Sequence, residues 1–235
     1  MLNSHQITDK LLQNWCELLQ NFDINQTAAE KTFTQIAEAY STPNRYYHNL
    51  EHIHHVLEVI QTLTLKSQTE DLQTETVQLA AWFHDIVYDT KAKDNEEKSA
   101  QYAVEFLSSL SIPPEFIKNV ENMILATKHQ LLNGVKQNST TGDRLTQILL
   151  DADLAILSSN PEEYSKYAHA IRQEYIWVPE TEYIAARKQI LQNFLQRKNI
   201  YFTKSMQQTK DKMGASQMCK NIICHCERSE AIATL

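Results

Sequence analysis

Apolar residues recur along the chain with the spacing of amphipathic helices. They return every three or four positions in residues 7–19, 33–40 and 56–63, which places them on one face of a helix. Residues 76–87 are instead apolar on nearly every side, which is typical of a helix buried all round. Further helices are expected at residues 96–110, 113–131, 143–158, 161–176 and 180–197. Because no segment has a convincing strand pattern, we expect an all-α fold of eight or nine helices.

The helical pattern ends near the C-terminus. From about Thr203, Lys, Gln, Ser and Met residues mix without a period. We therefore expect a domain over residues 1–203, followed by an appended, disordered tail over residues 204–235. The tail holds four residues of types that bind zinc: Cys219, Cys224, His225 and Cys226. Structural zinc sites usually place two ligand pairs well apart, whereas these four fall within eight residues, so a plain tail is the favoured interpretation.

Composition narrows the range of functions. Lys and Arg number 22 against 29 Asp and Glu, a formal net charge of −7, which argues against a non-specific nucleic-acid binder and against adsorption to an anionic membrane. The three glycines lie far apart, which excludes phosphate-binding and dinucleotide-binding loops with fixed glycine spacing. The longest solid apolar stretch, residues 79–83, is too short to span a bilayer. The polar N-terminus and the crowded cysteines predict a cytoplasmic location.

Histidine and aspartate interrupt apolar sequence in three segments, residues 44–56, 80–89 and 149–157. In the second, His84 and Asp85 lie in the helix expected to be most buried. Burying an aspartate without a partner is costly. A divalent cation is an economical partner because it binds an imidazole nitrogen and a carboxylate oxygen together. The alternative is a buried histidine beside an aspartate that caps a helix or forms a salt bridge elsewhere.

The other two segments favour the metal interpretation. Asp151 and Asp153 lie inside an expected helix and not at its N-cap, where aspartate is common. His48 and His52 are four residues apart and would share one face if their helix has begun, although both could be solvated surface residues. Residues of metal-binding types occur in apolar surroundings on three separate expected helices. Such a coincidence is unlikely without a shared role.

The order of these residues resembles the HD superfamily of metal-dependent phosphohydrolases, and within it the small single-domain predicted phosphohydrolases. Five matched segments carry the resemblance: Arg-x-Tyr-His-Asn-Leu-x-His-Ile at 45–53, Trp-Phe-His-Asp-x-Val-Tyr-Asp at 82–89, Asn-Glu-x-x-Ser-Ala at 95–100, Leu-Asp-x-Asp-Leu-x-Ile-Leu at 150–157 and Ile-Arg-x-Glu-Tyr at 171–175. The resemblance covers about residues 8–203. It implies a single HD-type helical bundle and a metal-dependent phosphohydrolase.

The resemblance also implies a ligand set. A single divalent transition metal (Mn, Fe, Co, Ni or Zn) would be bound by His52, His84, Asp85 and Asp153. Asp153 is favoured over Asp151 because the family's last aspartate usually precedes a leucine step. Two imidazoles and two carboxylates suit these ions better than calcium.

Other residues are candidates for the reaction itself. A metal with open positions lowers the pKa of a bound water and polarises a phosphoryl group. Charge that develops on the phosphate oxygens requires cationic donors, for which Arg45 is the first candidate and Lys128, His129 and Arg172 are weaker ones. His48 could orient the phosphate or transfer a proton. Asp89, four residues after Asp85 and expected one helical turn further on, could act as a general acid or position water.

The expected substrate is a phosphate ester or anhydride of a nucleotide-like small molecule. Some HD proteins that hydrolyse alarmones have an acidic pair where this chain has Tyr88 and Asp89, so an alarmone substrate is less favoured. One alternative is a dinuclear HD oxygenase, which needs further histidines between the doublet and the last aspartate, where the chain has only His129. Another is a binding or regulatory protein with a structural metal. No nucleic-acid polymer or membrane partner is expected, and an exposed apolar helix face could support a homodimer.

Overall fold

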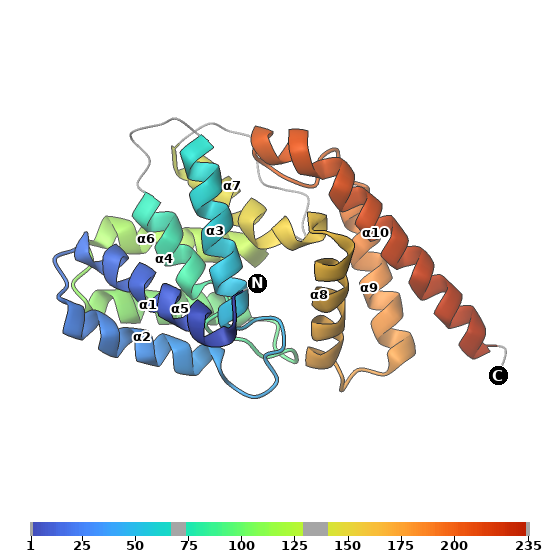
Figure 1. Ribbon diagram of the computed structural model, residues 1–235, viewed down its shortest axis with the longest axis horizontal. Coiled ribbons are helices and arrows are strands. Elements are labelled where there is room, and N and C mark those ends of the chain that lie inside the picture. The colour runs from blue at the N-terminus through green and yellow to red at the C-terminus, as the bar shows by residue number, and fades with distance from the viewer. Residues whose placement is uncertain (1, 67–73, 129–140, 234–235) are drawn as a thin grey trace.

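The computed structural model describes residues 2–66, 74–128 and 141–233. Within these ranges every regular element is a helix, which confirms the all-α fold (Figure 1). The elements are α1 (Ser4–Gln20), α2 (Gln26–Tyr40), α3 (Leu50–Lys66), α4 (Thr74–Phe83), α5 (Asn95–Ser109), α6 (Pro114–Thr127), α7 (Thr141–Leu154), η2 (Ala155–Ser158), α8 (Pro161–Glu174), α9 (Glu180–Leu195) and α10 (Lys204–Ala233).

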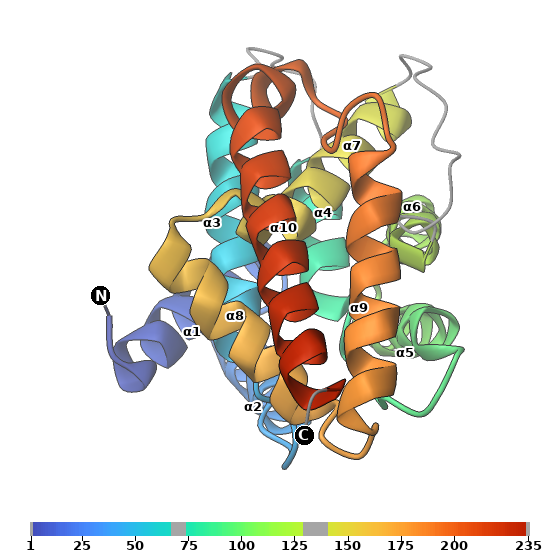
Figure 2. The ribbon, with the colours of Figure 1, turned by 90° about the vertical axis from the view of Figure 1, so that its right-hand side faces the viewer.

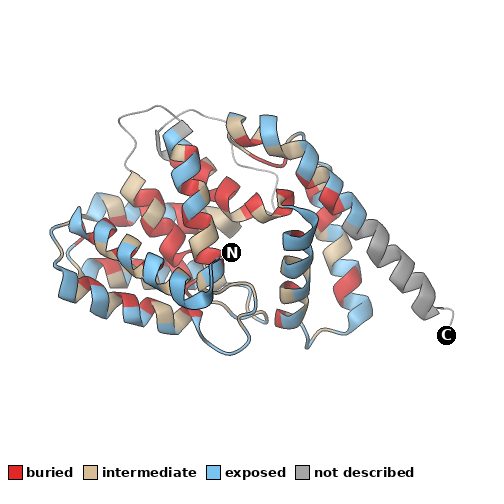
Figure 3. Ribbon diagram, viewed as in Figure 1, coloured by how far each residue is buried: buried red, intermediate tan, exposed pale blue. Residues whose placement is uncertain are grey.

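Helix α4 lies at the centre of the fold and contacts α3, α5, α6 and α7. From Thr76 to its end, every residue except Gln78 is buried, as the all-round apolar pattern predicts (Figure 3). The Trp82 ring meets Trp15 of α1 edge-on at 5.3 Å and Phe33 of α2 at 6.1 Å. Large apolar side chains contribute roughly 1.5–3 kcal/mol each when fully buried, so these contacts fix α4 against the N-terminal helices.

Helix α4 is shorter than the sequence pattern predicts. It ends at Phe83, and the chain then turns over residues 84–89. The guanidinium of Arg45 donates hydrogen bonds to the carbonyl oxygens of Asp85 and Ile86, at 2.7 and 2.8 Å, so a side chain distant in sequence satisfies these carbonyls at the helix end. The His-Asp doublet therefore lies just after the helix, and Asp89 is not one helical turn beyond Asp85.

Helices α8, α9 and α10 lie side by side on the far side of η2 (Figures 1 and 2). The carboxamide of Asn160 caps α8 by accepting the N–H of Glu163, and Pro161 occupies the first turn, where its missing N–H costs nothing. Pro179 likewise precedes α9. These starts agree with the predicted helices. Among the described residues, no helix is both long enough and apolar enough to cross a membrane.

The prediction of a disordered tail is wrong for residues 204–220, because these residues form the first part of α10. Met206 and Met218 are buried in the main core, and α10 contacts both α9 and η2. Gly214 allows this approach, since a Cβ there would lie 3.3 Å from the Ile200 side chain. Cys224, His225 and Cys226 lie outside the described side chains, so the zinc interpretation is not tested there.

Candidate metal centre

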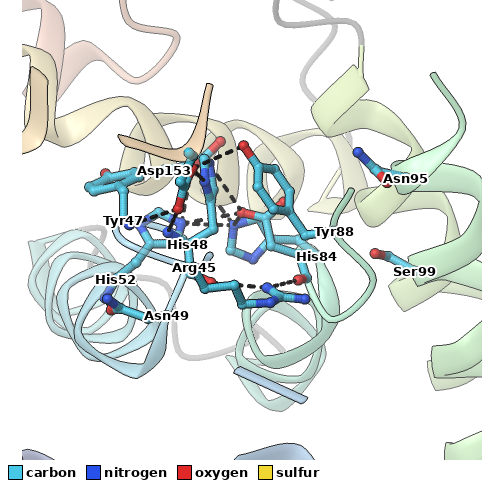
Figure 4. Close-up of polar contacts among 12 residues, drawn as sticks. Arg45, Tyr47, His48, Asn49, His52, His84, Tyr88, Asn95, Ser99 and Asp153 are labelled. Carbon is cyan, nitrogen blue, oxygen red and sulfur yellow. Dashed lines mark hydrogen bonds and ion pairs between the residues drawn. The ribbon is translucent and has the colours of Figure 1, made fainter. Parts of the chain in front are cut away.

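Four side chains of metal-binding types converge where α3, the end of α4 and α7 pack against one another (Figure 4). His52 lies in the first turn of α3, which the Asn49 carboxamide caps by accepting the N–H of Glu51 at 2.9 Å. His84 and Asp85 follow α4, and Asp153 lies near the end of α7. Each side chain offers one ligand atom, and all four atoms lie within 4.8 Å of one another. The structure therefore brings together every predicted metal ligand.

The spacing of the ligand atoms fits one shared cation. The Nε2 atoms of His52 and His84 are 3.1 Å apart. Oδ2 of Asp85 lies 3.1 Å from His84 Nε2 and 3.5 Å from His52 Nε2, and Oδ1 of Asp153 lies 3.4 Å from His52 Nε2. Two atoms bonded at about 2.1 Å to one transition metal, at angles of about 90–110°, lie roughly 3.0–3.4 Å apart. The donor set and its spacing thus suit one transition-metal ion.

A hydrogen bond orients His84 towards the cluster, and packing orients His52. Nδ1 of His84 lies 2.9 Å from the carbonyl oxygen of Ala81, so its N–H donates to the backbone and leaves the lone pair of Nε2 facing inward. The His52 side chain is fully buried and packs on the Tyr47 ring at 4.8 Å. Its Nδ1 has no hydrogen-bond partner among the described residues, so packing sets the orientation of this ring.

The four groups perturb one another's pKa. Burial lowers the pKa of His52. Burial also acts to lower the pKa of His84, but the neighbouring carboxylates of Asp85 and Asp153 outweigh it and raise that pKa well above its usual value. The pKa values of both carboxyls fall, despite burial, because His84 is close. Metal ligands must be deprotonated, so a cation would displace the proton that this cluster otherwise holds.

Asp151 has a different role from Asp153. Its carboxylate accepts the N–H groups of Phe202 and Thr203, at 2.7 and 2.8 Å, and so holds the chain at the start of α10. Burial raises the pKa of Asp151 to about 6. The geometry therefore agrees with the predicted choice of Asp153 as the last ligand.

The family model for the HD domain matches residues 50–156. Residues 50–156 are therefore an HD domain. The match contains all four residues of the cluster, with His84 and Asp85 as the doublet that gives the domain its name. No curated protein matches the chain. Helices α8, α9 and α10 lie outside the matched region.

A third histidine, His48, lies beside the cluster of His52, His84, Asp85 and Asp153. His48 precedes α3, and its Nε2 lies 4.0 Å from Oδ2 of Asp85. Its Nδ1 is 2.6 Å from a carboxylate oxygen of Glu174, whose side chain is fully buried, and its ring stacks on Tyr88 at 4.1 Å. Burial acts to lower the pKa of His48, but the hydrogen bond to Glu174 and the nearby carboxylates of Asp85 and Asp153 together outweigh it, and the pKa is raised.

Glu174 is a residue that the sequence reasoning missed. It also accepts the backbone N–H groups of Tyr47 and His48 and the hydroxyl of Tyr88. One buried carboxylate at the end of α8 thus orients the whole segment that leads into α3. The available signal was its place in the matched segment 171–175, where an acid follows apolar and basic positions.

The two arginines predicted to bind phosphate have structural roles instead. Arg45 donates to the carbonyl oxygens of His48 and Asp85 and so joins the two segments that carry the cluster. Arg172 donates to two carbonyl oxygens in the turn after α8 and stacks on Tyr183. Their donors are committed to the backbone, which corrects both predictions. His129 lies outside the described residues.

The structure also places Asp89 away from the role predicted for it. It is exposed, and its carboxylate accepts the N–H of Lys91 at 2.9 Å, while its backbone pairs with the side chain of Asn95. The residue closes a turn and does not line the cavity beside the cluster. A role as general acid is therefore not supported by its position.

A cavity of about 350 Å³ adjoins the cluster. Asp85 and Asp153, whose side chains are 19% and 21% exposed, face it, whereas His52 does not line it. Residues of α8 and α9 form another wall of the cavity, and Arg187 of α9 is one of them. Lys128, which directly follows α6, also lines the cavity. Arg187 belongs to no motif, so it could not be identified from the sequence.

Proposed function

We propose that this HD protein is a metal-dependent phosphohydrolase acting on a phosphate ester or anhydride of a nucleotide-like small molecule. One observation carries the proposal: two imidazoles and two carboxylates lie at the spacing of a single cation, and the two carboxylates border a cavity large enough for a small molecule. The residues present fit a transition metal such as Mn, Fe, Co, Ni or Zn.

The chemistry divides between the metal ligands and the residues around them. A bound cation would supply a water of lowered pKa and polarise the phosphoryl group. His52 and His84 would hold the cation through Nε2, and the carboxylates of Asp85 and Asp153 would add the negative charge that retains it. His48, held by Glu174, presents Nε2 towards Asp85 and is placed to hold or move a proton at that atom.

The alternatives are supported less well. A dinuclear oxygenase needs further ligands, and in the described ranges the candidate cluster comprises four residues. A binding protein with a purely structural metal does not require the His48–Glu174 pair beside the cavity. We also propose a cytoplasmic location without membrane or nucleic-acid partners, in keeping with the free thiols of Cys16 and Cys219. The homodimer stays a prediction.

The test combines elemental analysis with a phosphate-release screen. Purified protein would be assayed over nucleotides and phosphomonoesters with added Mn, Co, Ni, Mg or Zn. We expect one metal per chain and phosphate release that requires it. His84→Ala and Asp85→Ala should each abolish metal uptake while helicity, measured by circular dichroism, is retained.

Asp89→Asn is the matched control, because it removes a nearby carboxylate that faces away from the cavity. This variant should keep its metal. Stoichiometric metal in both His84→Ala and Asp85→Ala would overturn the ligand assignment. Two irons per chain without phosphate release would favour the oxygenase.

A further inference from the structure

Arg187 of α9 lies in an aromatic setting at the edge of the cavity. Its guanidinium donates to the hydroxyl of Tyr167 at 2.9 Å and lies 5.1 Å from the centre of that ring. Burial acts to lower the pKa of Arg187, but the tyrosines Tyr164, Tyr167 and Tyr183 together outweigh it, and the pKa is raised. Among the described residues no carboxylate pairs with this guanidinium.

The other cation on the cavity is already neutralised. Lys128 forms an ion pair with Glu97 at 2.5 Å and donates to the carbonyl oxygen of Lys93. Arg187 lacks such a partner in the described part of the chain, so its positive charge is balanced by no carboxylate there and is held by the hydroxyl and ring of Tyr167. An anion that enters the cavity would therefore gain more from Arg187 than from Lys128.

Arg187 is separated from the metal cluster by two tyrosine rings. The rings of His52 and Tyr47 are 4.8 Å apart, those of Tyr47 and Tyr167 are 4.7 Å apart, and Arg187 follows at 5.1 Å. The same cavity touches the carboxylates of the cluster and Arg187, and apolar side chains such as Ile171 and Leu191 line it. Its volume of about 350 Å³ falls in the range of roughly 300–1,000 Å³ typical of sites for whole small molecules.

We propose that Arg187 binds a second anionic group of the substrate, a phosphate or a carboxylate, while the reacting phosphate lies at the metal cluster. The preferred substrate is then a small phosphate ester or anhydride with a second anionic group, and the part between the two anionic groups packs against the apolar and aromatic side chains of the cavity. This inference rests on the proposed function, because it takes the metal cluster as the site of the reacting phosphate.

Phosphonates test the inference, because their P–C bond is not hydrolysed. Hexylphosphonate carries one anionic group, whereas 6-phosphonohexanoate and hexane-1,6-diphosphonate add a carboxylate or a second phosphonate to a flexible chain. Binding to the Mn-loaded protein would be measured by calorimetry. The two probes with a second anionic group are called the dianionic probes. We expect at least one of them to bind ten or more times tighter than hexylphosphonate, which corresponds to about 1.4 kcal/mol of binding free energy. The probe with the larger gain identifies the preferred second group.

Variants of residues on α9 test whether Arg187 is responsible for this gain in affinity. Arg187→Gln should reduce the affinity for the dianionic probes to that of hexylphosphonate, and Arg187→Lys should keep part of the gain, since lysine retains the charge without the planar fork. Lys188→Gln is the matched control: it removes a positive charge from the neighbouring position, which does not line the cavity, and should keep the full gain. Circular dichroism and melting temperatures verify that each variant is folded.

The outcomes separate this inference from the proposed function. Metal-dependent binding of hexylphosphonate that Asp85→Ala abolishes supports the metal cluster as a phosphate site. If that binding is present but the dianionic probes gain nothing, or keep their gain in Arg187→Gln, the role of Arg187 is overturned and the proposed function stands. If no phosphonate binds in a metal-dependent way, both are overturned.

Discussion

Asp151 and Asp153 show how two aspartates on one helix acquire different tasks. Positions two apart on a helix point roughly 200° away from each other, so only one of them can face the cluster. Asp153 lies 3.4 Å from His52 Nε2, whereas Asp151 accepts backbone N–H groups before α10. The two residues therefore form a matched pair for testing the metal ligands.

We expect Asp153→Asn to weaken metal binding by more than the roughly 10–100-fold loss typical of changes outside the ligand set, because it removes a charged ligand. Asp151→Asn should retain one metal per chain, since its carboxylate does not face the cluster. Calorimetric titration with Mn and elemental analysis would measure both variants. Equal metal affinity in the two variants would contradict the assignment of Asp153.

His48 and Glu174 give a second prediction at the scale of single residues. His48→Gln should lower kcat by roughly 100-fold or more, as expected for a lost proton carrier, while the metal content stays unchanged. Glu174→Gln should lower kcat less and leave KM nearly unchanged, because Glu174 positions His48 and does not touch the cavity. The measurement is steady-state kinetics on any substrate that the phosphate-release screen identifies.

A double variant separates positioning from a merely structural effect. If Glu174 acts through His48, then Glu174→Gln should have little further effect on kcat once His48 is replaced, because the two changes remove one unit. Additive losses would show that Glu174 acts independently of His48. A loss of metal from either single variant would instead place these residues in the ligand set.

At the scale of elements, α10 offers the sharpest test because the sequence pattern gave it no helical period. Met218 is completely buried and Met213 is 46% exposed. Replacing a buried methionine by alanine costs about 2–5 kcal/mol, and 1 kcal/mol shifts the melting temperature by about 2–4 °C in a protein of this size. Met218→Ala should therefore lower the melting temperature by several degrees, whereas Met213→Ala should leave it nearly unchanged.

The contrast between α4 and α10 shows what the sequence could predict. The apolar run of α4 reports burial directly, so its existence and its central place were predictable. Its end was not, because Arg45 binds the carbonyl oxygens of the turn from 40 residues away in sequence. α10 depends on contacts of the same kind, among them the hydrogen bonds that Asp151 accepts just before it.

The residues of the candidate site also fall into those that the sequence could predict and those that it could not. Residue types in apolar surroundings indicated a metal site, and the resemblance to the HD superfamily implied His52, His84, Asp85 and Asp153 as its ligands. They could not predict Glu174 or Arg187, whose roles arise only where α8 and α9 pack near the cluster. For Arg45 the error was chemical: a cation near a ligand segment can bind phosphate or backbone carbonyls, and only the fold distinguishes the two.

At the scale of the whole molecule, the metal cluster joins parts of the chain that are distant in sequence. His52 belongs to α3, Asp85 follows α4, and Asp153 belongs to α7. An unfolded chain does not hold these residues together, so a cation should bind the native state far better than the unfolded state. Metal binding then adds to the free energy of unfolding by mass action.

We therefore expect protein dialysed against EDTA to melt below the same protein reloaded with Mn. At a free metal concentration 100 times the dissociation constant the gain is about 2.7 kcal/mol, which corresponds to a rise of roughly 5–10 °C in melting temperature. Asp85→Ala should remove this rise, because the variant lacks one of the four ligands, whereas Asp89→Asn should keep it. Identical melting temperatures for the EDTA-treated and reloaded protein would contradict a native-state metal site, because a cation bound through α3, the α4 turn and α7 cannot leave stability unchanged.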